Sequence, residues 1–145
     1  MKILRLYYKV PPLKGGMEKH IYFLSRIQSN QNEVTVFYNQ GDRITDNDVQ
    51  VLPNFKVDKL KPQFLCVLLF HISSILKLFK TKSKFDVVHV HGDWSTLLLI
   101  SIIKKITNAK VVAFSIHDQL LSNFKKKVLR FLIKQVDLIF TSGAD

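Results

Sequence analysis

Small and polar residues follow three apolar runs of this chain, at the points where buried strands are expected to end. They are Gly15-Gly16 after the run at 3–8, His91-Gly92-Asp93 after the run at 87–90, and His117-Asp118 after the run at 111–116. Because the strands of a parallel sheet point the same way, the loops at their carboxyl ends line one crevice. We therefore expect the chemistry of this protein at that edge.

Two consecutive glycines, Gly15 and Gly16, precede a helix that we expect to begin near Met17. Glycines let the backbone approach a ligand without an intervening Cβ. The free N–H groups and partial positive charge at a helix start favour an anion such as a diphosphate. The spacing matches neither the dinucleotide fingerprint nor a Walker loop, so a plain turn is the alternative interpretation.

Two histidines and two aspartates complete the candidate crevice. His117 can donate a hydrogen bond to a phosphate or a sugar hydroxyl, or carry a proton, because imidazole titrates near neutral pH. Asp118 is placed to cap the next helix or to line the crevice. His91, at the end of its strand, and Asp93 are also candidates for the acceptor side of the crevice. Strand alternation puts His89 on the same side as His91, where we expect a core residue. No open three-ligand spacing is evident, so no metal site is predicted.

Apolar runs alternate with segments of helical periodicity along the chain. The strand candidates are Lys2–Tyr8, Glu33–Tyr38, Val49–Leu52, Phe85–Val90, Val111–Ile116 and Asp137–Thr141. The helix candidates are a segment from Met17 with Ile21, Leu24 and Ile27, a segment opened by Pro62, Leu97–Ile106 and Leu120–Gln135. This alternation predicts an α/β fold, a doubly wound, mostly parallel Rossmann-like sheet with strand order 3-2-1-4-5-6. The polar stretch Asn39–Asp48 is predicted to be a surface loop.

The composition is that of a globular domain, with 145 residues of which 47% are hydrophobic. The lone Cys66 excludes a disulfide framework and fits a reducing compartment. The amino terminus lacks a signal-peptide pattern, and the apolar stretch Phe64–Leu76 falls short of the ~20 residues of a spanning helix. The net charge is +11, with no acid between Lys59 and Phe85 or between Gln119 and Val136, which favours anionic partners.

Five segments occur in an order and at distances that suggest one family. They are Pro12–Ile21, Glu33–Phe37, Asp86–Gly92, Phe114–Asp118 and Thr141-Ser142. In this pattern the chain resembles the amino-terminal domain of family 4 glycosyltransferases, which are retaining enzymes of the two-domain GT-B fold. The resemblance covers essentially all of residues 1–145.

The resemblance implies that this domain holds the acceptor, while a second Rossmann-like domain holds most of the nucleotide-sugar. Gly15 and Gly16 would bring backbone amides to the donor diphosphate, and His117 matches the family's histidine beside the reacting sugar. Glu18 falls in the Gly-Gly-x-Glu pattern and is expected at the helix start rather than in the chemistry. The nucleotide-sugar is a substrate, so neither a cofactor nor a metal is expected.

We therefore expect the amino-terminal half of an enzyme that transfers a sugar from a nucleotide-sugar to a glycan or lipid-linked acceptor in cell-surface polysaccharide synthesis. The donor-binding domain lies outside this sequence, so the chain is interpreted as truncated, as a gene fragment or as half of a split enzyme, inactive by itself. One alternative is a non-catalytic, membrane-associated adaptor half. A basic nucleic-acid-binding domain is another, which charge alone supports, and a sugar-nucleotide epimerase of GT-B type is a third.

The helix predicted at 120–135 adds a hypothesis about membranes. Its cations form a broad basic face made of Lys125, Lys126, Lys127, Arg130 and Lys134. We expect the opposite stripe to pack on the sheet; it consists of Leu121, Phe124, Val128, Phe131 and Leu132. A basic face suits anionic head groups, so a cytoplasmic protein attached peripherally to the inner face of the cell membrane is predicted.

Overall fold

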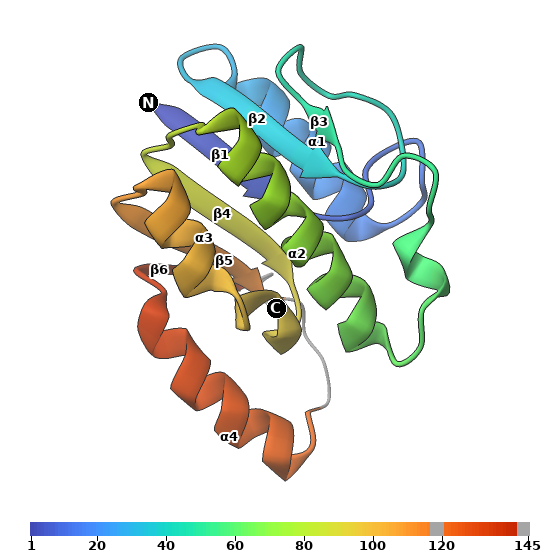
Figure 1. Ribbon diagram of the computed structural model, residues 1–145, viewed down its shortest axis with the longest axis vertical. Helices are drawn as coiled ribbons and strands as arrows, with labels where there is room; N and C mark the ends of the chain where they lie inside the picture. The colour runs from blue at the N-terminus through green and yellow to red at the C-terminus, as the bar shows by residue number, and fades with distance from the viewer. Residues whose placement is uncertain (117–120, 142–145) are drawn as a thin grey trace.

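The computed structural model, which describes residues 1–116 and 121–141, is built on a six-stranded parallel sheet (Figure 1). The strands are β1 (Lys2–Leu6), β2 (Glu33–Tyr38), β3 (Val49–Gln50), β4 (Val87–Gly92), β5 (Val111–Ile116) and β6 (Leu138–Thr141). Every neighbouring pair is parallel, and the order across the sheet is β3-β2-β1-β4-β5-β6. The predicted fold class and strand order are confirmed.

Helices cover both faces of this sheet. They are α1 (Gly16–Gln28), α2 (Gln63–Thr81), α3 (Ile100–Thr107) and α4 (Asn123–Leu132), with 3-10 turns η1 (Val57–Lys59), η2 (Trp94–Leu97) and η3 (Ile133–Gln135). In Figure 1, α2 runs across the front of the sheet and α1 lies behind it. The core residues of α2, α3 and α4 belong to one hydrophobic cluster, and those of α1 to another.

Alternation along β1 shows how one strand serves both cores. Leu4 and Leu6 pack in the cluster of α2 and α3, whereas Ile3 packs with Ile21 of α1. Both sides of the central strands are therefore buried, which explains their nearly continuous apolar sequences. The carboxyl ends of the strands meet at one edge, as the right-handed crossovers of this fold require.

The helix α2 is the most apolar element of the fold. Among the helices within residues 1–116 and 121–141, α2 is long enough and apolar enough to cross a membrane, judged by length and composition alone. Its mean hydropathy is 1.7. Here it packs on the sheet, with Cys66, Phe70 and Leu78 in the core. It begins after Pro62 and ends at Lys82, whose left-handed backbone (φ 52°) closes its last turn. Core packing accounts for one side of α2 only.

Two predicted helices are shorter than their periodicity suggested. The segment 97–106 is divided, because η2 ends at Leu97 and α3 starts at Ile100. The reason is Asp93, which accepts a hydrogen bond from Ser95 N and starts the chain into a 3-10 turn. In the later segment α4 begins at Asn123, where the Ser122 hydroxyl accepts a bond from Lys125 N.

The predicted packing of the α4 stripe is wrong for its two phenylalanines. Leu132 is buried and Val128 packs against the core, but Phe124 and Phe131 are 73% and 70% exposed. The two rings lie seven residues apart and so share one row along the helix. Val128 and Leu132 lie on the side of α4 that faces the sheet. The row of Phe124 and Phe131 points away from that side, so the two rings remain exposed.

Candidate functional site

A pocket of about 300 Å³ lies where the start of α1 meets the carboxyl ends of β5 and β6. Its lining consists of Gly16, Met17, His20, Ser115, Ile116, Phe140 and Thr141. Ile116 directly precedes His117, which lies outside the described residues, as does Asp118. The pocket thus brings Gly16 together with the end of the strand that leads to the predicted catalytic histidine.

The two glycines have different surroundings. The backbone of Gly15 is extended (φ 168°), and a Cβ there would collide with the carboxylate of the buried Glu18. A Cβ on Gly16 would meet no atom within 4 Å. Gly15 therefore makes room for Glu18, and Gly16 leaves open space at the pocket. Glu18 lies in the first turn of α1, as the sequence predicted.

The start of α1 is the part of this site that is suited to an anion. The first N–H groups of a helix have no intrahelical acceptors, and the helix dipole adds a partial positive charge there. The open space at Gly16 gives a ligand access to that turn. The arrangement suits a phosphate group, as at the glycine-bearing helix starts of nucleotide-binding sheets.

The histidines of β4 form a stack behind the pocket. The rings of His89 and His91 lie on one side of the strand with centroids 4.1 Å apart, which confirms the predicted alternation. His89 Nε2 is 2.8 Å from the Ser115 hydroxyl, a core role. His91 is 1% exposed, and its ring nitrogens have no hydrogen-bond partner among the described residues. Its ring centroid is 6.0 Å from that of His20, which lines the pocket.

Burial keeps these histidines uncharged at neutral pH. It lowers the pKa of His89 to about 3, with smaller contributions from Arg5 and His20. It also holds the pKa of His91 well below its usual value, assisted by His89, Arg5 and His20. Since both rings are neutral, neither adds a positive charge to the site.

Arg5 of β1 is a buried residue that the sequence pattern did not indicate, and its side chain lies between the sheet and α1. Its side chain is 0% exposed and donates to Ser25 Oγ and Gln28 Oε1 of α1, each at 2.5 Å. Burial lowers the pKa of Arg5 to about 10, while the charge of Asp48 acts in the opposite direction. The guanidinium therefore stays charged and joins α1 to β1. A cation within an apolar strand is the signal that could have identified it.

Asp93 has structural partners at the end of β4. Its carboxylate accepts from Ser95 N at 2.9 Å and from the Ser95 hydroxyl. Its charge also acts on Tyr7, whose pKa is raised mainly by burial and further by Glu18. Asp93 thus caps η2, and its role in the cleft stays a prediction.

The remaining candidates lie away from the pocket. The five cations Lys125, Lys126, Lys127, Arg130 and Lys134 are exposed on α4 and η3. In the described part of the chain no group of three or more His, Cys, Asp or Glu side chains is placed to hold a metal ion.

A second cavity, of about 380 Å³, shares His20, Ser115, Phe140 and Thr141 with the first and continues along the sheet beside α1. Of these lining residues, His20 was detectable in sequence, since it lies one helical turn beyond Gly16.

Comparisons with known proteins place the chain in a family. The family model described as Glycosyltransferase Family 4 matches residues 14–143. No curated protein matches the chain. Among solved structures it is similar to the catalytic domain of starch synthase IV from Arabidopsis thaliana bound to ADP and acarbose, with a TM-score of 0.60 and 15% identity over 81% of this chain.

The chain spans 34% of the length of that starch synthase structure. At 15% identity this likeness concerns the fold, and the family assignment rests on the match to residues 14–143. The parallel sheet in the order 3-2-1-4-5-6 agrees with both findings. The chain therefore belongs to glycosyltransferase family 4 and carries a Rossmann-like domain of the GT-B type.

Proposed function

We propose that this chain is the acceptor-side, amino-terminal half of a retaining glycosyltransferase. It acts in the cytoplasm on a nucleotide-sugar donor and a glycan or lipid-linked acceptor, in cell-surface polysaccharide synthesis. The observation that carries the proposal is the pocket shared by Gly16 and Ile116, between the start of α1 and the end of β5. The ADP in the similar starch synthase structure supports a nucleoside diphosphate as part of the donor.

The chemistry assigned to this chain is electrostatic and positional. The amides at Gly15 and Gly16 stabilise the diphosphate as its bond to the sugar loosens. The acceptor hydroxyl approaches the same face of the sugar, which preserves the anomeric configuration. His117 aligns the reacting groups by hydrogen bonding. A donor-binding domain, in the same or a separate chain, closes over the site and excludes water.

Replacing Gly16 with alanine separates folding from ligand binding. A Cβ at this position meets no protein atom within 4 Å, so the free energy of unfolding of Gly16→Ala should equal that of the wild type or exceed it by up to ~1 kcal/mol. The same methyl group would occupy space assigned to the diphosphate. We expect sugar transfer to fall at least about tenfold, equivalent to ~1.4 kcal/mol. The measurement is incorporation of labelled sugar by membranes of cells lacking the gene, complemented with each variant.

The matched control is Lys110→Ala, a change of an exposed residue just before β5, at the opposite edge of the sheet. It should leave both stability and transfer unchanged. Wild-type transfer by Gly16→Ala, with wild-type stability, would remove the diphosphate from this pocket.

Replacing His117 with alanine tests the second assigned role. Loss of one preorganised hydrogen-bond donor typically lowers a rate by ~10²–10³, and we expect a loss of that order in the same complementation assay. A turnover close to that of the wild type would exclude His117 from the site.

A further inference from the structure

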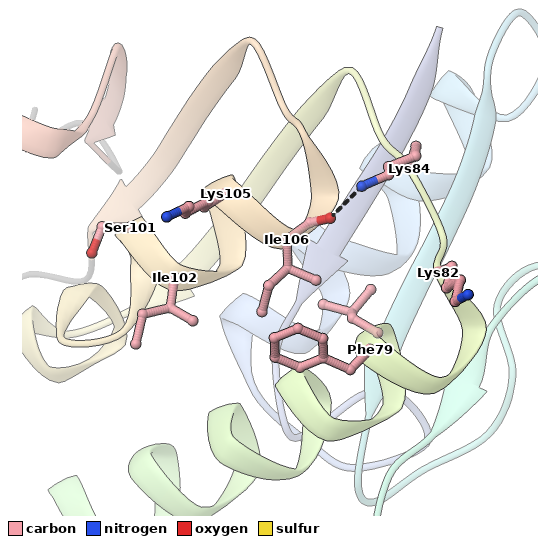
Figure 2. A pocket seen from close by; sticks show the side chains of 8 residues that line it. Phe79, Lys82, Lys84, Ser101, Ile102, Lys105 and Ile106 are labelled. Atoms are coloured by element: carbon pink, nitrogen blue, oxygen red, sulfur yellow. Dashed lines mark hydrogen bonds between the residues drawn. The ribbon is translucent and has the colours of Figure 1, made fainter.

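A groove of about 680 Å³ lies between the end of α2 and the outer side of α3 and shares no lining residue with the candidate site. Figure 2 shows Phe79 of α2 facing Ile102 and Ile106 of α3 across this groove. Three lysines, Lys82, Lys84 and Lys105, also line the groove around these apolar side chains. Lys84 Nζ donates to the Ile106 carbonyl at 3.0 Å, which holds one ammonium at the mouth of the groove.

An exposed apolar stripe on α2 leads into this groove. Ile72, Leu76 and Phe79 are 42%, 58% and 59% exposed, and their i, i+4, i+7 spacing places them on one line. Ile102 of α3, 45% exposed, continues the apolar surface. Contiguous apolar surface rimmed by polar groups marks an interaction site. We call Leu76, Phe79 and Ile102, with Lys82, Lys84 and Lys105, the α2–α3 patch.

Basic side chains prevail around the α2–α3 patch, and a carboxylate from outside these helices, Asp137, pairs with Lys104 of α3 at 3.1 Å. None of the 11 acidic residues of the chain falls within 59–85, 94–117 or 119–136, so α2, α3 and α4 carry no carboxylate side chain. All three helices pack on the same face of the sheet (Figure 1). The basic side chains of α4 and the exposed rings of Phe124 and Phe131 therefore extend the same layer.

We propose that the α2–α3 patch binds the surface of a bilayer that contains anionic phospholipid. Leu76, Phe79 and Ile102 enter the boundary of the acyl chains, while the three lysines contact lipid phosphates. Aliphatic side chains between lysines are typical of interfacial helices, because lysine stems cover apolar surface while their ammonium groups reach the head groups. Binding to nucleic acid would not explain the exposed Leu76 and Ile102, because aliphatic side chains gain little from contact with a phosphate backbone. The proposal goes beyond sugar transfer and does not depend on it.

Vesicle sedimentation of the 145-residue chain tests the proposal. Wild-type protein should bind vesicles of phosphatidylcholine with phosphatidylglycerol, bind phosphatidylcholine alone weakly, and lose affinity as salt rises. Leu76→Ser with Phe79→Ser should lower the partition coefficient by about tenfold or more, because both side chains lose their apolar insertion. Lys82→Asn with Lys105→Gln should lower it roughly fivefold for each lysine removed.

A matched control is available on the opposite face of the sheet. Phe23 and Ile27 of α1 are 61% and 67% exposed, and Phe23→Ser with Ile27→Ser should leave vesicle binding unchanged. An equal loss in the α1 and α2 variants would overturn the proposal. Binding to anionic vesicles that ignores the loss of Leu76 and Phe79 would also overturn it and assign the basic layer to polyanions such as nucleic acid.

A second measurement does not require removal of the apolar side chains. An environment-sensitive dye attached to Ile102→Cys should shift its emission to the blue when anionic vesicles are added, whereas the same dye on Ile27→Cys should not. The native Cys66 is buried and is expected to remain unlabelled. Equal responses at both positions, or none at Ile102→Cys, would contradict insertion of the α2–α3 patch.

Discussion

The protein is expected to lose most of its folding stability between pH 6.5 and pH 5. Three histidines are buried in the native state: His71 in α2 and the stacked pair His89 and His91 in β4. Burial lowers the pKa of His71 to about 4 and that of His89 to about 3, and holds the pKa of His91 well below 6.5. Each ring is therefore neutral when the protein is folded.

The direction of the effect follows from proton binding. Above pH 6.5 the rings are neutral in both the folded and the unfolded states, so the stability does not depend on them. Below pH 6.5 the unfolded chain binds protons that the native protein does not, until the pH reaches the lowered pKa of each ring. Each histidine then removes about 1.4 kcal/mol of stability per pH unit. At pH 5 the three together remove about 6 kcal/mol, which is comparable to the total stability of many domains.

Urea unfolding between pH 8 and pH 4.5 measures this loss, and His91→Leu is the informative variant. Leucine removes two buried ring nitrogens without a described partner, so the variant should be more stable at pH 5. Its slope of free energy against pH should be smaller by about 1.4 kcal/mol per pH unit. His71→Leu should reduce the slope by the same amount. A slope that neither variant changes would mean that other groups cause the acid sensitivity.

The sheet was predictable because its strands are covered on both faces. Glu33–Tyr38 and Val111–Ile116 were predicted with the bounds that the structure shows, since long apolar runs bounded by polar residues leave little choice. Strand order followed from the alternation of strands and helices, which is typical of doubly wound sheets. The predicted strand at 49–52 is shorter in the structure, with β3 at Val49–Gln50.

Helix positions were predicted less well where local hydrogen bonds compete with periodicity. Asp93 starts a 3-10 turn before α3, and Ser122 sets the start of α4, yet neither changes the apolar spacing. The exposed rings of Phe124 and Phe131 show a related difficulty. Periodicity locates an apolar stripe, but its width exceeds the part that the neighbouring sheet covers.

Candidate residues at strand ends were partly predictable. Parallel topology brought Gly16 and the end of β5 to one pocket, as the sequence argument required. His91 was a candidate for the crevice, but the strand continues to Gly92 and keeps its ring inside. Its ring lies 6.0 Å from that of His20 in α1, a neighbour that is distant in sequence.

Buried polar residues were the least predictable part of the fold. The stretch Asn39–Asp48 was predicted to be a surface loop, and most of it is, but its two ends are only 2% and 3% exposed. The amide of Asn39 donates to Val51 O and accepts from Val57 N, which ties β2 to the next segment. Such residues carry no hydrophobic pattern, so only their partners in space reveal them.

Asp48→Ala is expected to destabilise the protein by about 3–5 kcal/mol, because this carboxylate holds the loop between β2 and β3. Its Oδ1 accepts from Val36 N at 2.8 Å, and its Oδ2 accepts from Ile44 N at 2.8 Å and from Thr45 N at 2.9 Å. The Thr45 hydroxyl donates a fourth bond at 2.5 Å. Alanine would leave the N–H groups of Val36 and Ile44 without their acceptor in a buried site, where each costs about 1–3 kcal/mol, while the two bonds from Thr45 are only part-buried and add less.

Thermal unfolding should show a Tm lower by about 10 °C or more for a chain of this size. Asp46→Ala is the matched control, because Asp46 is exposed in the same loop and its loss should change Tm by little. Asp48→Asn should fall between the two, since the amide keeps one oxygen as acceptor but turns the other into a donor that faces N–H groups. If Asp48→Ala unfolded at the same temperature as Asp46→Ala, the four hydrogen bonds would contribute little, and the ends of this loop would be held by the apolar contacts of Ile44 and Val51 alone.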